Sequence, residues 1–145
     1  MTFFIRAVDL ETANKRFVGG PDRFLGVVIE EINEEEHFVS ASFEVSEKSV
    51  QPFGLLHGGV SCLVGESVAS FAGNMTVDDG FSTVGQSLTA NHLRSAQIGD
   101  KILATARNTY RGRRSQVWNV DLVRKKDQKL ISQVILTLSV IEVRQ

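Results

Sequence analysis

One carboxylate stands alone in an otherwise uncharged stretch of the chain. From Gly58 to Thr76 the sequence contains no proline and no charged residue except Glu66. A helix over this span would be roughly 28 Å long at about 1.5 Å per residue. It would be apolar on nearly every side, which is typical of a helix in the middle of a fold. Because burial disfavours the charged form of a carboxyl group, we expect the pKa of Glu66 to be raised.

Helical spacing places small and polar residues beside this carboxylate. At about 100° per residue, Gly59, Glu66, Ser70 and Gly73 fall near one face of the helix. The Ser70 hydroxyl therefore lies one turn beyond the Glu66 carboxylate. Residue types alone leave two interpretations of Glu66: a group that does chemistry, or a carboxylate paired with an Arg from another element.

Length and composition are those of an ordinary globular chain. Its 145 residues are 42% hydrophobic and 23% charged, and the net charge is −1. These values indicate one domain and give no electrostatic reason to expect nucleic acid or a membrane as a partner. The single cysteine, Cys62, excludes an internal disulfide and is expected to be a buried core thiol. The chain has no run of 18 apolar residues and no signal-peptide pattern, so we expect it in the cytoplasm.

Motifs for metals and phosphates are missing from the sequence. The three histidines are scattered without the spacing of zinc ligands, and no GxxxxGK[ST] segment occurs. We therefore expect no metal and no cofactor. A serine hydrolase is also disfavoured, because Ser61, Ser67 and Ser70 lie in the expected helix without a GxSxG elbow.

Patterning along the chain predicts two strands, one long helix and then four strands. Before them, residues 9–17 are expected to form a short amphipathic helix capped by Asp9. One helix among six antiparallel strands must be covered by a strongly curved sheet if all its sides are to be buried. We therefore predict one α+β domain over residues 1–145, with residues 1–23 as an N-terminal helical extension. The strands are expected at 24–32, 37–45, 81–93, 101–110, 115–124 and 129–143, and the long helix at 58–76.

Several motifs in combination resemble one enzyme family. They are Gln51, the triplet His57-Gly58-Gly59, Glu66 with Ser70, the segment ANHLRSA at 90–96 and the segment RGRR at 111–114. The chain is similar in these to the hotdog-fold acyl-CoA thioesterases. More narrowly, it resembles the branch with 4-hydroxybenzoyl-CoA, 1,4-dihydroxy-2-naphthoyl-CoA and phenylacetate-pathway thioesterases, over about residues 24–142. The resemblance implies a hotdog fold, in which a curved antiparallel sheet wraps around one long central helix, and hydrolysis of an acyl-CoA thioester.

The resemblance also implies catalytic roles. Glu66 would be the nucleophile or the general base for water, and the Gly58 N–H would be the main donor to the oxyanion. The chemistry of a helix N-terminus agrees, because its first N–H groups lack intrahelical partners and lie at the positive end of the helix dipole. Gln51 would contact the thioester, and Ser70 would hold water or the carboxylate. His57 would shape the loop at the thioester, or it would only order that loop.

Coenzyme A would bind to basic residues in two segments. His92, Arg94 and Ser95 match positions that hold the nucleotide and pantetheine parts in relatives. Arg111, Gly112, Arg113 and Arg114 put a turn glycine among three guanidinium groups, which suits bidentate phosphate contacts, with a solvated hairpin turn as the alternative. RGRR is taken to be the only dense basic cluster, which disfavours nucleic acid as a ligand. The acyl group would meet an apolar and aromatic pocket lined by Phe53, Val68 and Phe71.

Several functions remain open on the sequence. The segments QPFGLLHGG, ANHLRSA and RGRRSQVW favour 1,4-dihydroxy-2-naphthoyl-CoA, of menaquinone or phylloquinone biosynthesis, as the substrate. A broad-specificity, phenylacetyl-CoA or hydroxybenzoyl-CoA thioesterase is the alternative. A hotdog acyl-thioester hydratase and a non-catalytic acyl-CoA-binding protein are further alternatives.

The expected strand at 81–93 has consequences for assembly. It carries no charge from Phe81 to Asn91, so nothing in it repels a second copy of the chain. Hotdog relatives pair such edges, which implies a homodimer with two active sites at its interface. Gln51 and His57 of one subunit would then face Glu66 of the other. Because relatives commonly pair these dimers, the resemblance implies a homotetramer.

Overall fold

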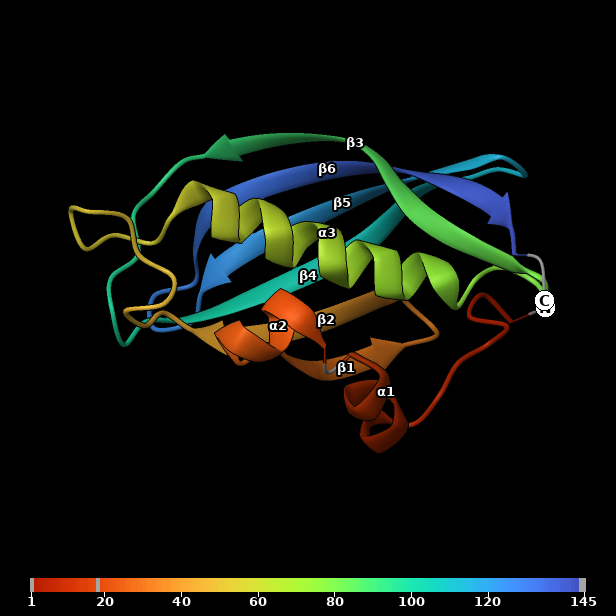
Figure 1. The fold of residues 1–145 in the computed structure, drawn as a ribbon, viewed down its shortest axis with the longest axis horizontal. Coiled ribbons are helices and arrows are strands. Elements are labelled where there is room, and N and C mark those ends of the chain that lie inside the picture. Colours follow the sequence, from red (N-terminus) through yellow and green to blue (C-terminus); the bar gives the residue numbers. More distant parts are fainter. Residues whose placement is uncertain (1, 18, 144–145) are drawn as a thin grey trace.

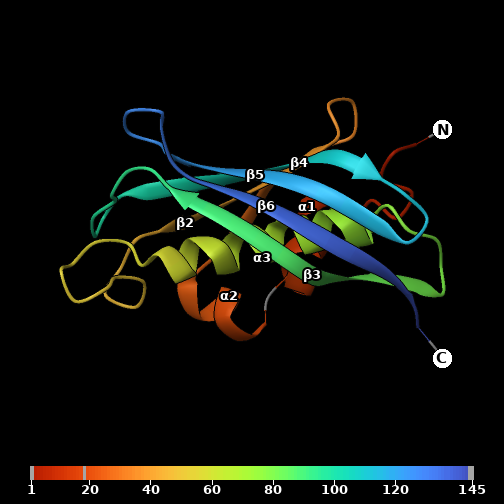
Figure 2. The same ribbon diagram turned by 90° about the horizontal axis from the view of Figure 1, so that it is seen from above.

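The computed structural model describes residues 2–17 and 19–143. Six antiparallel strands form one sheet in the order β1-β2-β4-β5-β6-β3, and this sheet curves around a long helix, α3 (Figures 1 and 2). This confirms the predicted α+β hotdog architecture. The elements are α1 (Leu10–Phe17), α2 (Gly20–Leu25), β1 (Val28–Asn33), β2 (Phe38–Glu44), α3 (Gly58–Asn74), β3 (Phe81–His92), β4 (Lys101–Arg111), β5 (Ser115–Arg124) and β6 (Lys129–Glu142).

The last four strands and the first helix lie where local patterns predict them. β3 to β6 begin and end within one residue of the expected ranges, and α3 ends two residues earlier than expected. The predicted cap of α1 is confirmed, because Oδ1 of Asp9 accepts a hydrogen bond of 2.8 Å from the Thr12 N–H.

The region before β1 differs from the prediction. A strand was expected to begin at residue 24, but residues 20–25 form α2 and the strand begins at Val28. Pro21 lies in the first turn of α2, where its missing N–H costs nothing, and Gly26 ends the helix in the left-handed conformation at φ 72°. Proline and glycine thus bracket a helical turn inside a segment whose apolar residues suggested a strand.

Small residues let α3 approach the sheet closely. A Cβ built on Gly73 would lie 2.5 Å from Cδ1 of Leu138, and one built on Gly65 would lie 3.0 Å from Cγ2 of Val134. Trp118 of β5 is fully buried in the core beneath the helix, and a cavity left by its replacement with Ala would cost about 3–5 kcal/mol. The buried residues of α3 are Ser61, Val64, Gly65, Val68, Ala69, Ala72 and Gly73.

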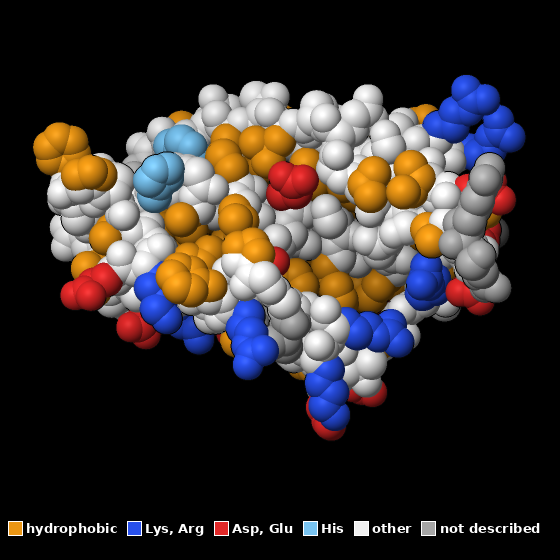
Figure 3. All heavy atoms as spheres, viewed as in Figure 1, with side chains coloured by type: hydrophobic (Ala, Val, Ile, Leu, Met, Phe, Trp, Pro, Cys, Tyr) orange, Lys and Arg blue, Asp and Glu red, His pale blue; other side chains and the backbone are white. Residues whose placement is uncertain are grey.

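The sequence predicted that the sheet would cover α3 on every side, and this prediction is wrong. One face of the helix stays open on the side drawn toward the viewer in Figure 1, and hydrophobic side chains gather along it while most Lys and Arg side chains lie toward the rim (Figure 3). β3 is an edge strand, as expected, and β1 is the other edge. Among the described residues, no helix is long and apolar enough to cross a membrane.

Candidate active site

The open face of α3 forms a groove with Glu66 in its wall. Its volume is about 510 Å³, and its lining residues are Gly59, Cys62, Leu63, Glu66, Ser67 and Ser70. The expectation that Glu66 is buried is wrong for a single chain, because the side chain is exposed where the sheet leaves the helix uncovered. No Arg or Lys pairs with Glu66 in the described part of the chain, so the alternative of a structural ion pair is not supported there.

Cys62 and Gly73 lie differently from their predicted places. Cys62 is only half-buried and lines the groove, so it is not a core thiol. Burial raises the pKa of the Cys62 thiol, and the nearby Glu66 carboxylate raises it further. Gly73 faces the sheet, since a Cβ built on it would lie 2.5 Å from Cδ1 of Leu138, and it does not line the groove. The face that carries Gly59, Glu66 and Ser70 is as predicted.

The edge strand β3 holds the Glu66 side chain from one side. A Cβ built on Gly85 would overlap Oε1 of Glu66 and would lie 3.0 Å from its Cδ. Gly85 stands at a β-bulge, where the pairing of β3 with β6 shifts between Gly85 and Ser87. The missing side chain at this position therefore leaves the space that the carboxylate occupies. Sequence reasoning missed Gly85, although a glycine inside a strand pattern is a signal for such a close approach.

The N-terminus of α3 offers one N–H group to a ligand. Nδ1 of His57 accepts a hydrogen bond of 2.8 Å from the Gly59 N–H, so His57 caps the helix and occupies that donor. The Gly58 N–H makes no hydrogen bond to any residue in the ranges 2–17 and 19–143. Gly58, the predicted main donor, is thus left for an oxyanion, whereas the Gly59 N–H is not.

Gln51, Gly58, His92 and Arg94 lie together around this N-terminus. They share a pocket of about 150 Å³, whose other lining residues are Leu56, Ser61, Ile131 and Ser132. The His92 ring packs against the helix start, because a Cβ built on Gly58 would lie 2.6 Å from its Nε2. The other ring nitrogen, Nδ1, is 2.8 Å from Oγ of Ser132, which fixes the ring orientation. The structure therefore brings these four predicted residues together, while Glu66 opens onto the separate groove.

Gly112 and Arg113 lie at the opposite end of α3. They line a pocket of about 440 Å³ with residues that follow the C-terminus of the helix, among them Thr76 and Asp78. Arg94 lies beside the first residue of the same helix, whose 17 residues span roughly 25 Å. One chain therefore does not bring Arg94 and Arg113 to the same place. Arg114, in the same hairpin, is exposed.

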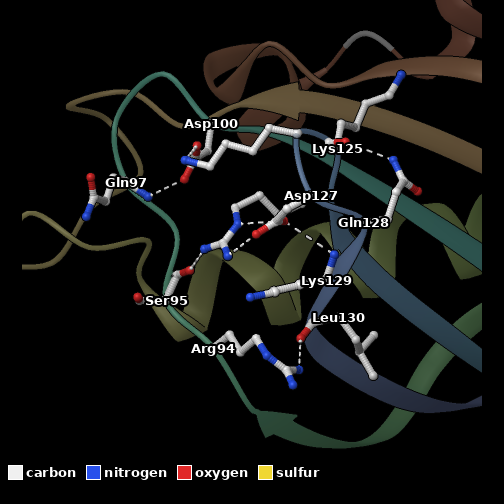
Figure 4. Close-up of polar contacts among 11 residues, drawn as sticks. Arg94, Ser95, Gln97, Asp100, Lys125, Asp127, Gln128, Lys129 and Leu130 are labelled. Atoms are coloured by element: carbon white, nitrogen blue, oxygen red, sulfur yellow. Dashed lines mark hydrogen bonds and ion pairs between the residues drawn. The ribbon is translucent and has the colours of Figure 1, made fainter.

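The loop with Arg94 and Ser95 is fastened to the β5–β6 hairpin (Figure 4). Nη1 of Arg94 donates 2.9 Å to the Leu130 carbonyl, and Nη1 of Arg124 donates 2.6 Å to the Ser95 carbonyl. Arg124 also forms an ion pair of 2.6 Å with Asp127. This hairpin carries RKKDQK at residues 124–129, so the expectation that RGRR is the only dense basic cluster is wrong.

The structure does not assemble the predicted acyl pocket. Phe53 is 88% exposed in the loop before α3, and Val68 is fully buried against the sheet. Phe71 packs edge-on against Phe17 with ring centroids 5.7 Å apart, on a different side of the helix. The spacing of these residues gave no information on which of them the sheet covers. The groove beside Glu66 is instead lined by Cys62, Leu63 and Ser67.

Comparison with known proteins gives the family. The family model described as "Thioesterase superfamily" matches residues 53–131, more than half of the chain. The chain belongs to the thioesterase superfamily. It is 33% identical to the 1,4-dihydroxy-2-naphthoyl-CoA hydrolase of Escherichia coli over 132 residues, which cover 91% of this chain and 95% of that one. It is 34% identical to the proofreading thioesterase EntH of Cronobacter sakazakii over 115 residues, or 79% and 82% of the two chains.

A solved structure of the superfamily has the same fold. The crystal structure of a thioesterase from Haemophilus influenzae superposes with a TM-score of 0.91 and 34% sequence identity, covering 99% of this chain and 97% of that chain. The expected membership of the hotdog thioesterases is confirmed. This member of the thioesterase superfamily is a thioester hydrolase. Its family membership therefore supports the hydrolase over the hydratase and over the non-catalytic binding protein.

Proposed function

We propose that this thioesterase hydrolyses an aryl-CoA, first of all 1,4-dihydroxy-2-naphthoyl-CoA, to the free acid and CoA. The observation that carries the proposal is that α3 presents both a Gly58 N–H and an exposed Glu66 carboxylate, neither of which has a partner among the residues that the structure describes. Hydrolysis of a thioester needs a nucleophile or a base for water, and a donor at the oxygen where negative charge develops. Similarity to the E. coli 1,4-dihydroxy-2-naphthoyl-CoA hydrolase supports the choice of acyl group.

This chain supplies a side chain or N–H group for each step of thioester hydrolysis. The Gly58 N–H donates a hydrogen bond to the thioester oxygen. This hydrogen bond becomes stronger as the carbonyl becomes a tetrahedral oxyanion. Glu66 attacks the carbonyl carbon or takes a proton from the attacking water. Ser70, one turn further along the groove, positions that water or the carboxylate. Gln51, which shares the pocket of Gly58, orients the thioester.

The geometry of α3 favours a site shared by two chains. Gly58 and Glu66 are separated by eight residues, which is about 12 Å along a helix axis. A reacting carbonyl must lie about 3–3.5 Å from the attacking group while it accepts the oxyanion bond. Antiparallel pairing of the uncharged β3 edge with its copy would place the N-terminal pocket of one chain near the groove of the other. We therefore propose a homodimer with two shared sites, and a homotetramer built from such dimers.

The same pairing would also bring the two basic groups together. Arg94 lies near the start of α3, and Arg113 lies near its end. Because the two chains would run antiparallel, Arg113 and Arg114 of one subunit would lie near the His92 and Arg94 positions of the second copy. Such a combined surface suits the phosphates of CoA, because guanidinium groups bind phosphate in a bidentate manner.

The test is thiol release from a panel of acyl-CoA thioesters, followed with a thiol reagent. The panel contains 1,4-dihydroxy-2-naphthoyl-CoA, 4-hydroxybenzoyl-CoA, phenylacetyl-CoA and a medium-chain alkyl-CoA. We expect the highest kcat/KM with the naphthoyl thioester. A higher kcat/KM with alkyl-CoA would contradict the proposed acyl group, and no release from any member would contradict the proposed function.

A further inference from the structure

A carboxylate from the N-terminal extension lies behind the wall of the Glu66 groove. α2 packs against α3 so that Oγ of Ser67 donates a hydrogen bond of 2.8 Å to Oδ2 of Asp22, 45 residues earlier in the chain. Ser67 directly follows Glu66 and lines the same groove. Asp22 is therefore linked to the groove through a single hydroxyl group.

The other oxygen of Asp22 has no hydrogen-bond partner among the described residues. Oδ1 is buried and makes no hydrogen bond to any residue that the structure describes. Desolvation raises the pKa of the Asp22 carboxyl, and the Ser67 hydroxyl only partly offsets this. A buried carboxylate oxygen without a donor is costly. A tether between α2 and α3 needs one acceptor, which a neutral amide would supply at lower desolvation cost, so the charge at Asp22 points to a role beyond docking.

The hydrogen bond to Asp22 determines what Ser67 offers to the groove. A hydroxyl has one proton and two lone pairs, and the Ser67 proton is directed at Asp22. Its lone pairs are then left to accept a hydrogen bond from the groove side. A bond to an ionised group is stronger than a neutral one, and it polarises the hydroxyl so that Ser67 becomes a better acceptor.

We propose that Asp22 and Ser67 form a specificity-determining pair that selects acyl groups with a hydrogen-bond donor, such as a ring hydroxyl, over acyl groups without one. This inference rests on the proposed function, because it assumes that the acyl group lies in the groove beside Glu66. The negative charge of Asp22 disfavours a phosphate of CoA at this position. A neutral donor on the acyl group fits the acceptor that Ser67 presents.

The experiment compares benzoyl-CoA with 2-, 3- and 4-hydroxybenzoyl-CoA in thiol release. We expect the wild-type enzyme to prefer at least one hydroxylated isomer. In Ser67→Ala and Asp22→Ala, kcat/KM for that isomer should fall about tenfold more than kcat/KM for benzoyl-CoA, since a site built for a hydroxyl loses its discrimination when the acceptor is removed. Asp22→Asn keeps an oxygen for the Ser67 bond and removes the charge, so it should show a smaller loss of the same preference.

The control variant is Ser42→Ala, which removes another serine hydroxyl that donates to a carboxylate, that of Glu30, between β2 and β1. It should leave the ratio of hydroxybenzoyl to benzoyl activity unchanged. Equal losses for both substrates in Ser67→Ala and in both Asp22 variants would show a docking role only and would overturn the inference. Equal wild-type activity toward all four substrates would overturn it as well. Failure of the wild-type enzyme to release thiol from any acyl-CoA would instead overturn the proposed function and, with it, this inference.

Discussion

The Glu66 carboxylate occupies the space that a side chain at residue 85 would fill. A Cβ on Gly85 would overlap its Oε1, and the bulge in β3 brings the strand to this position. The contact joins a helix residue to an edge strand, so the carboxylate is oriented by the sheet and not by its own helix alone. Gly85 is in this sense a positioning residue for Glu66.

Replacement of Gly85 by Ala should lower kcat by about tenfold or more with little change in KM, because a displacement of about 1 Å of a reacting group can cost two orders of magnitude. Single-turnover rates would measure the effect. Ser87→Ala, at the same bulge, is the control, and an unchanged kcat in Gly85→Ala would contradict the positioning role.

Replacement of Glu66 by Gln or Ala should lower kcat by at least about a hundredfold and leave the fold intact, as for a lost acid–base or nucleophilic group. Circular dichroism would verify folding. Turnover in isotope-labelled water, under single-turnover conditions, would separate the two roles. Label that enters Glu66 requires an acyl-enzyme anhydride in which water attacks the Glu66 carbonyl, and it would exclude a purely general-base role.

Mixed dimers test the shared site. Glu66→Ala and Gln51→Ala subunits should each be inactive alone, and mixing them should restore up to about one working site per hybrid dimer, because each chain supplies the half that the other lacks. Mixtures that stay inactive, after subunit exchange is verified by mass spectrometry, would place both halves in one chain. Sedimentation equilibrium would give the size of the assembly, and an active monomer would refute the dimer.

Neutralising Arg94, Arg113 or Arg114 should raise KM for several acyl-CoAs alike and leave kcat nearly unchanged, the pattern of lost uniform binding. A truncated thioester without the nucleotide is the matched control, since it should be hydrolysed equally by the variants and the wild-type enzyme. Replacement of Arg94 should also make its loop less ordered, because its guanidinium donates a hydrogen bond to the Leu130 carbonyl. A KM effect confined to one acyl group would show that these residues contact the acyl part.

The ion pair of Arg124 and Asp127 predicts a dependence of stability on acid pH. The Arg124 hydrogen bonds lower the pKa of Asp127 to about 2. A carboxyl group whose pKa is lowered by folding stabilises the protein above its unfolded pKa, near 4, and this contribution is lost as the pH falls toward 2. Denaturant unfolding should therefore show Asp127→Asn to be less stable than the wild-type protein at pH 7, with the difference closing between about pH 4 and pH 2. A difference that does not change over this range would contradict the assignment.

Local patterns in the sequence determined most of the secondary structure and one central residue of the site. The Asp9 cap, the span of α3 and the bounds of β3 to β6 depend on hydrogen bonds and periodicities within a few residues, and these are readable from the chain. Glu66 could be singled out because it is the only charge in a long apolar helix. α2 was missed because the apolar residues around Phe24 and Leu25 fit a strand as well as a short helix, although Pro21 at its start and Gly26 at its end are local signals for a helix.

Tertiary structure alone decided how Glu66 is surrounded. Its exposure follows from where the curved sheet stops, and the contact with Gly85 follows from a bulge in an edge strand 19 residues away. The bond between Asp22 and Ser67 joins two helices that no shared periodicity connects. The burial of Val68 and the exposure of Phe53 likewise depend on which side of α3 the sheet covers. Contacts between distant segments depend on the packing of whole elements. A short stretch of sequence therefore does not indicate which distant residues will lie against it.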